Sequence, residues 1–172
     1  MALRLPQSLD PTLRVRSSDW GTRNATGEPG AYSAPDLTPS DPHFLEAIER
    51  GVRPLVLEIV ERGFVTYTSC EGHRYPDEVG LPPVGRSVGV LPRGPAELDV
   101  VRRWFDRTIQ RLSPDEHVRV ERHDLVLSDA SGRTVPVCDL ALVPIDSWEA
   151  FFDAVDAVTA QLLRLLRDAW LV

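Results

Sequence analysis

The hydrophobic residues of this chain change period along the sequence, from the helical spacing of 3.6 to the strand spacing of 2 and back, and this order constrains the fold most strongly. Helical spacing predicts helices over 42–62 and 96–112, and a third from the Asp146 and Glu149 capping box to Trp170. Gly51 and Pro54 are expected to kink or divide the first of these, and Gly63 to end it.

Runs of β-branched and aromatic residues separate these helical segments. They predict strands over 64–69 and 84–91, and a hairpin over 117–145 around the turn "SDASGR". The resulting order is helix, strand, strand, helix, strand, strand, helix. It predicts an α+β sandwich in which three helices cover an antiparallel or mixed sheet of about four strands.

A chain of 172 residues can bury a core without disulfides or a structural metal. The density of Pro, Gly, Ser and Asn in residues 1–40 predicts an irregular N-terminal arm, ahead of a single α+β domain over 41–172. Trp20 and Tyr32 suggest that this arm packs against the domain or closes over a site. The alternative is a partly ordered tail.

Charge and targeting signals narrow the class of protein. A net charge of -7 disfavours non-specific binding to nucleic acid or to an anionic membrane. The sequence has no signal-peptide pattern and no apolar segment long enough to span a bilayer, so we expect a cytoplasmic protein. Two cysteines, Cys70 and Cys138, are too few for a disulfide framework and are expected to be free thiols. The oligomeric state stays open.

The segment "SCEGH", residues 69–73, is the strongest candidate for chemistry. It has three interpretations, of which the first is a tight turn, with Gly72 at positive φ and Cys70 as a small buried hydrophobe. In the second, Cys70 is a nucleophile, its base is His73, His117 or His123, and Glu71 orients the imidazole or moves a proton. In the third, Cys70 and His73 ligate zinc or iron and Glu71 is a non-ligand acid or base.

The metal interpretation needs further ligands, and the attractive donors lie in the predicted hairpin: His123 with Asp124, and Cys138 with Asp139. Cys138 alternates in phase with a core face and His123 with a solvated face, which weakens both as ligands. Asp139 interrupts an apolar face, so it needs a partner or a role. We retain His123 and Asp139 as candidate metal ligands.

Residues around the loop are candidates for binding a ligand: Ser69, Gly72, Arg74, Tyr75, Arg86 and Arg93. The three arginines could hold an anionic group, although solvated charge also explains them. Gly85, Ser87 and Gly89 leave one strand face nearly bare, so a ligand or a covering helix could approach it. Tyr67, Tyr75 and Trp104 could form an aromatic wall or belong to the core.

The element order and Ser69, Cys70 and Gly72, with the threonines before them, resemble the wybutosine-synthesis methyltransferase family over residues 43–165. That family carries a strand leading into a Ser-Cys-x-Gly-Arg turn. The resemblance implies S-adenosylmethionine as cofactor, a modified guanosine of tRNA as substrate, and a ligand pocket lined by this loop. His73 replaces the family's arginine and Glu71 its common serine. The turn is also similar to "SCEGH" turns of small uncharacterised bacterial and phage proteins, which implies no activity.

We therefore predict a small cytosolic enzyme with its site on the Cys70–His73 loop. Cys70, Glu71 and His73 would act on a small anionic or nucleotide-like substrate by metal-assisted or thiolate chemistry. The alternatives are a non-catalytic module that binds a ligand or a partner, a methyltransferase-like protein using S-adenosylmethionine, and an assembly protein that associates through its last helix.

Overall fold

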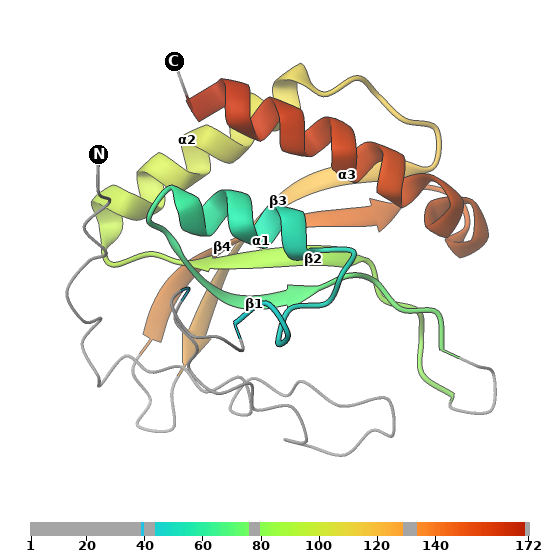
Figure 1. The fold of residues 1–172 in the computed structure, drawn as a ribbon, viewed down its shortest axis with the longest axis horizontal. Helices are drawn as coiled ribbons and strands as arrows, with labels where there is room; N and C mark the ends of the chain where they lie inside the picture. The colour runs from blue at the N-terminus through green and yellow to red at the C-terminus, as the bar shows by residue number, and fades with distance from the viewer. Residues whose placement is uncertain (1–38, 40–43, 76–79, 129–133, 171–172) are drawn as a thin grey trace.

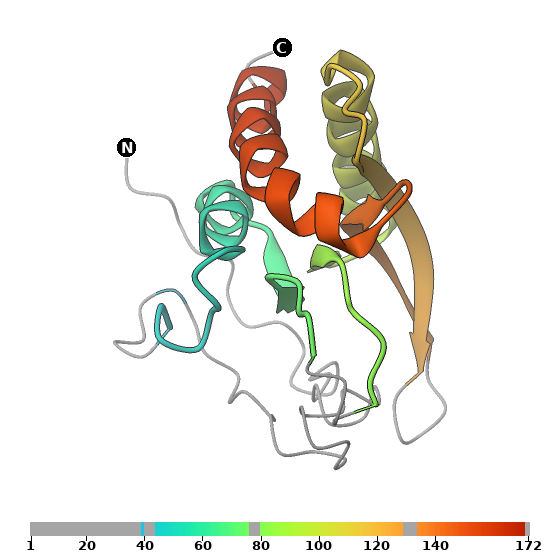
Figure 2. The same cartoon turned by 90° about the vertical axis from the view of Figure 1, so that its right-hand side faces the viewer.

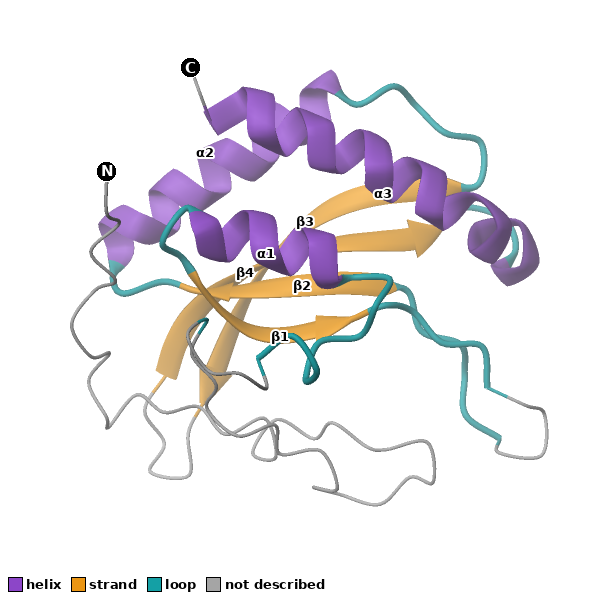
Figure 3. Ribbon diagram, viewed as in Figure 1, coloured by secondary structure: helices purple, strands orange, loops and turns teal. Residues whose placement is uncertain are grey.

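The computed structural model describes residues 39, 44–75, 80–128 and 134–170. Most of the predicted arm and the tip of the predicted hairpin, 129–133, lie outside the described residues. The order of helices and strands agrees with the sequence prediction (Figure 1). The elements, coloured by type in Figure 3, are α1 (Arg53–Glu61), β1 (Val65–Cys70), β2 (Arg86–Leu91), α2 (Pro95–Arg111), β3 (Val118–Ser128), β4 (Thr134–Pro144) and α3 (Trp148–Trp170).

The four strands form one sheet in the order β1-β2-β4-β3, and all three neighbouring pairs are antiparallel. The three helices lie on the same side of this sheet (Figure 2). This confirms the α+β prediction and decides between its antiparallel and mixed versions. Strand β1, which ends at Cys70, is an edge strand, and the loop that follows it is therefore reachable from beside the sheet.

The core lies between the sheet and the helices. The sheet contributes alternate residues of β2 and β4, as the strand period predicts, and Cys138 is fully buried among them. Trp104 of α2 is also fully buried and stacks on Phe64 at 5.7 Å between ring centroids. Cys138 and Trp104 are therefore core residues, and an aromatic wall that includes Trp104 does not form.

The first helix is shorter than the sequence predicts, because residues 44–52 form turns and α1 begins at Arg53. Phe44, Ile48 and Val52 repeat at helical spacing and are buried, but a chain of turns achieves the same burial. The amide of Gly51 donates to the Glu71 carboxylate at 2.7 Å instead of extending a helix. The turn over 49–51 is thus tied to the loop after β1.

Helix α3 begins one residue later than the predicted capping box. The Ser147 hydroxyl accepts the Ala150 amide at 3.2 Å, so Ser147 is the capping residue and Asp146 instead accepts the Ser147 amide. The apolar stripe of α3 is buried against the rest of the chain, which accounts for the apolar surface we considered for assembly. No helix among the described residues is long and apolar enough to cross a bilayer.

The bare stripe of β2 is filled by a side chain and a neighbouring strand. A Cβ at Gly89 would lie 2.4 Å from Tyr67 Cε1 and 2.7 Å from Asp139 Oδ1, and one at Gly85 would lie 2.4 Å from the Leu142 carbonyl oxygen. These glycines permit a side chain from β1 and the backbone of β4 to approach closely. Neither a helix nor a ligand is needed to explain them.

Candidate functional site

Gly72 allows the side chains of Cys70 and His73, at the two ends of the "CEGH" loop, to lie near each other. In a regular strand, residues three apart point to opposite faces of the sheet, so Cys70 and His73 would diverge. Gly72 has φ +92°, which breaks this alternation, and the chain then rejoins an antiparallel bridge between His73 and Val84. Both hydrogen bonds of that bridge are 3.0 Å. The prediction of positive φ at Gly72 is confirmed, and the turn holds a defined shape.

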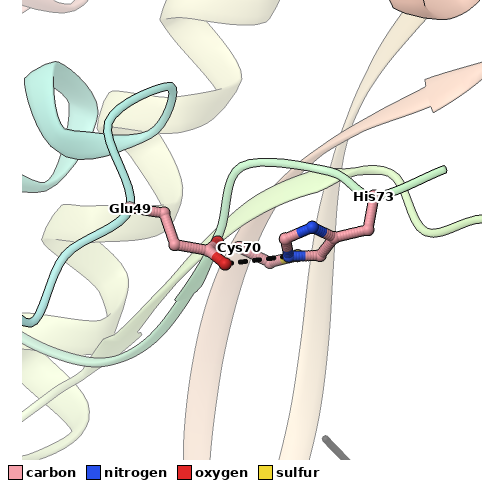
Figure 4. Close-up of side chains that lie close together, drawn as sticks. All are labelled: Glu49, Cys70 and His73. Carbon is pink, nitrogen blue, oxygen red and sulfur yellow. Dashed lines mark ion pairs between the residues drawn. The ribbon is translucent and has the colours of Figure 1, made fainter. Parts of the chain in front are cut away.

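Glu49, from the turn before α1, completes a group of three with Cys70 and His73 (Figure 4). Its Oε1 lies 2.8 Å from Nε2 of His73, and its Oε2 accepts the backbone amide of Glu71 at 2.7 Å. One ligand atom from each of the three side chains lies within 4.8 Å of the others. A carboxylate, a thiol and an imidazole therefore converge on one point.

This donor set suits a divalent zinc ion. Zinc accepts cysteine sulfur, histidine nitrogen and carboxylate oxygen, and its tetrahedral ligand atoms lie about 3.3–3.8 Å apart for metal–ligand distances of about 2.0–2.3 Å. The observed 2.8 Å between Glu49 and His73 would need to lengthen by about half an ångström. The side chains of His73 and Glu49 are 33% and 38% exposed, which leaves room for a fourth ligand from solvent.

The electrostatics of Cys70 disfavour a free thiolate. Burial raises the pKa of the Cys70 thiol, and the negative charges of Glu49 and Glu71 raise it further. The Gly72 backbone hydrogen bond and Arg86 act in the opposite direction without reversing the increase. A raised pKa disfavours the thiolate that the nucleophile interpretation needs, so the group suits the metal interpretation better. A bound cation would supply the missing positive charge.

The structure does not bring His123 or Asp139 to this group. Cys70 is aligned with Ser87 of β2 and, through it, with Ala141 of β4, so Asp139 lies two strands away and two residues along the sheet. His123 lies on β3, opposite Asp139, and its Nε2 pairs with Glu121 at 2.8 Å. The sequence argument that placed His123 on a solvated face is correct.

Asp139 has a partner, as an acid on an apolar face requires. The Tyr67 hydroxyl donates to both carboxylate oxygens, at 2.8 and 3.0 Å. Burial nevertheless raises the pKa of Asp139, against the opposing effects of Tyr67 and His123. Burial and Asp139 likewise raise the pKa of Tyr67. The pair spans the sheet over Gly89 and is structural in these contacts.

The remaining predicted residues divide by position. Tyr75 lies beside the group, with its ring 5.8 Å from that of His73, and the Arg74 guanidinium lies 5.6 Å from the Phe152 centroid. Arg93 is elsewhere, because it pairs with Glu97 and donates to the Gly63 carbonyl. Ser69 pairs with Val88 within the sheet.

Two other predicted residues hold the loop in place. Glu71 accepts the Gly51 amide, so it supports the 49–51 turn and leaves the imidazole contact to Glu49. Arg86 is 5% exposed and donates to the Glu71 carbonyl at 2.9 Å, to Thr159 Oγ1 at 2.8 Å and to Asp156 Oδ1 at 2.8 Å. Arg86 thereby fastens the loop to α3.

Glu49 is the member of the group that the sequence argument missed. It lies 21 residues before Cys70 in a segment we assigned to a helix, and no local spacing connects the two.

Comparison of the chain with protein-family models, with curated proteins and with solved structures finds no match. The methyltransferase resemblance stays a prediction from the turn residues and the element order.

Proposed function

We propose that this protein is a metal-dependent enzyme in which Glu49, Cys70 and His73 hold one divalent ion, zinc in the first instance and iron as the alternative. The convergence of the three ligand atoms within 4.8 Å carries the proposal. Catalytic zinc sites have three protein ligands and one open position, whereas structural sites have four protein ligands. Three ligands on a partly exposed rim match the first kind.

The chain's own residues have separable roles in this proposal. A bound zinc ion would lower the pKa of a coordinated water and polarise a carbonyl or phosphoryl oxygen. The Glu71 amide donates to Glu49 Oε2 at 2.7 Å, so the loop that carries Cys70 and His73 also orients the Glu49 carboxylate. We assign proton transfer to the Glu71 carboxylate, which lines the neighbouring hollow: its Oε2 accepts the Gly51 amide, and its Oε1 has no hydrogen bond among the described residues. The proposed reaction class is hydrolysis of a small anionic substrate: water adds to the electrophilic centre, and the leaving group departs with a proton.

Metal content is the first test. Tag-free protein should bind one zinc ion per chain, and Cys70→Ser, His73→Asn and Glu49→Gln should each weaken zinc affinity by at least tenfold. Cobalt substitution should give a thiolate-to-cobalt charge-transfer band that Cys70→Ser removes. The matched control is His123→Asn. His123 Nε2 lies 2.8 Å from Glu121 Oε2, the same separation as between His73 and Glu49, but this pair does not belong to the group that contains Cys70. Zinc binding that is absent, or equally affected by His123→Asn, would overturn the site.

Turnover is the second test, because a metal site without chemistry would be a binding module. Zinc-loaded protein should hydrolyse activated esters from a panel of phosphate and carboxylate compounds. Glu71→Gln should keep its zinc and lose turnover by about 10²–10⁴-fold, the range for a group that transfers a proton. A panel with no zinc-dependent turnover would refute the enzyme and leave the metal site standing.

A further inference from the structure

A hollow of about 480 Å³ is lined by residues that are next to the proposed ligands in the chain, although Glu49, Cys70 and His73 do not line it themselves. Its walls are Arg50 and Gly51 of the turn, the Glu71–Gly72 segment of the loop, Arg86 of β2, and the first turns of α3. The same turn and the same loop supply all three proposed ligands. The hollow and the metal group are therefore built by the same two segments.

The acids of this hollow are already engaged. Asp156 accepts from Arg86 at 2.8 Å, and Glu71 Oε2 accepts the Gly51 amide at 2.7 Å. The Arg86 guanidinium donates its hydrogen bonds to protein acceptors. Asp156 and Arg86 therefore pair with each other, and neither needs a charged ligand as a partner.

One arginine that lines the hollow, Arg50, and one that contacts a lining residue, Arg74, carry charges without an acidic partner among the described residues. Arg50 lines it, is exposed, and makes no hydrogen bond or ion pair within the part of the chain that the structure describes. Arg74 is also exposed, and its contact there is with the ring of Phe152, a lining residue, at 5.6 Å from the centroid. Among the described residues, neither guanidinium has an acceptor, so both can donate hydrogen bonds to an anion.

The contact of Arg74 with Phe152 has a consequence for binding. A cation–π contact with a ring does not require a hydrogen-bond acceptor, and the Arg74 N–H donors have no acceptor among the described residues. Phe152 is fixed in turn, because it stacks on Trp148 at 5.9 Å and meets Phe151 edge-on at 5.1 Å. Arg74 is therefore placed beside a lining residue of the hollow with its donors available, and a guanidinium can bind an oxyanion through two of its N–H groups.

We propose that Arg50 and Arg74 form an oxyanion-binding site at this hollow, and that its ligand is a small molecule bearing a phosphate or carboxylate group. As a substrate site this rests on the proposed function, since the metal group would supply the chemistry. Binding of the anion itself does not need the metal. Because the chain has a net charge of -7, the protein as a whole does not attract anions, and the attraction comes from these two arginines. Both are exposed, so the affinity for the anion should fall as the salt concentration increases.

The test is a titration followed by the backbone amide resonances of Gly72 and Phe152, with inorganic phosphate, acetate and chloride as probes at constant ionic strength. Phosphate or acetate should bind saturably, and Arg50→Gln with Arg74→Gln should weaken binding at least tenfold. The matched control is Arg103→Gln with Arg107→Gln, which removes the same charge from exposed positions of α2 that have no ion pair within the described ranges.

Each outcome bears on the proposal. Saturation by phosphate alone identifies phosphate-bearing ligands, saturation by acetate alone identifies carboxylates, and saturation by both identifies oxyanions in general. Saturation by neither, or an equal loss in the control, overturns the site. Repeating the titration with metal-free Glu49→Gln protein separates the two proposals, because anion binding should persist there even if no metal ever binds.

Discussion

Arg86 connects the Cys70–His73 loop to α3 from inside the protein, and replacing it with methionine should affect both stability and the affinity for the proposed metal. The side chain is 5% exposed and donates to the Glu71 carbonyl, to Thr159 and to Asp156. Methionine keeps much of the aliphatic volume and removes all three donors. The substitution therefore tests the hydrogen bonds with little loss of packing.

The three contacts do not contribute equally. The side chain of Asp156 is 83% exposed, so its ion pair is screened and contributes less than about 1 kcal/mol. Thr159 also donates to the Val155 carbonyl at 2.7 Å, and it keeps that partner when Arg86 is lost. The Glu71 carbonyl loses a charged donor, and hydrogen bonds to charged groups contribute about 1.5–3 kcal/mol each. We expect Arg86→Met to lower the free energy of unfolding by about 2–4 kcal/mol.

Urea unfolding, followed by tryptophan fluorescence, measures this change. Asp156→Asn should cost less than about 1 kcal/mol, because it removes only the screened contact. Arg107→Met is the control for removing an arginine without a partner among the described residues, and it should leave stability within about 0.5 kcal/mol.

Zinc affinity, measured where each variant is fully folded, tests the positioning role. Losing the support of a ligand loop typically costs 10–100-fold in metal affinity. We expect that loss for Arg86→Met and none for Arg107→Met. If Arg86→Met is destabilised but binds zinc as tightly as the parent protein, the reasoning that Arg86 positions the loop is refuted.

Two further predictions concern groups with raised pKa values. Burial raises the pKa of Cys138 to about 12, and the side chain is fully buried. A thiol reagent should therefore modify one cysteine per chain in the native protein and two in urea, and zinc should protect Cys70. Two thiols that react fast in the native protein would contradict this. Burial also raises the pKa of Asp139, which lies beside Tyr67 and His123. The folded state therefore binds more protons than the unfolded state between the two pKa values, and the free energy of unfolding falls as pH rises from about 4 through the folded pKa. Asp139→Asn, which still offers Tyr67 an acceptor, should flatten that decline in urea unfolding over the pH range, and parallel curves for the two proteins would be the contrary result.

Hydrophobic period predicted most of the fold because each element buries one face against a common core. The pattern over 42–62 was wrong in its first half for a related reason. Phe44, Ile48 and Val52 need burial, and a period of about four residues records that need without recording how the backbone achieves it. The structure has turns there instead, and the Gly51 amide bonds to Glu71, which lies 20 residues away. A local pattern does not contain that partner.

The candidate site divides in the same way. Cys70 and His73 are near each other in sequence, and the glycine between them was enough to suggest that they act together. The other candidate ligands were polar residues of the hairpin strands, and the structure gives them other partners: His123 pairs with Glu121 on the same strand, and Asp139 pairs with Tyr67 on β1. Which residues meet on a sheet depends on the strand register, and the sequence did not specify that register.

Glu49 also explains why this group would be more than an exposed ion pair. Its two oxygens serve different elements, Oε1 facing His73 and Oε2 accepting the amide of Glu71. If a cation replaces the contact between Oε1 and His73, the Oε2 contact stays and orients the carboxylate from the far side, as an outer hydrogen bond does in metal sites. Zinc binding would then tighten the 49–51 turn against the loop, and Arg50, inside that turn, would be held at the hollow beside it. Metal affinity and anion affinity should therefore increase together, and by linkage each ligand should raise the affinity for the other by the same factor.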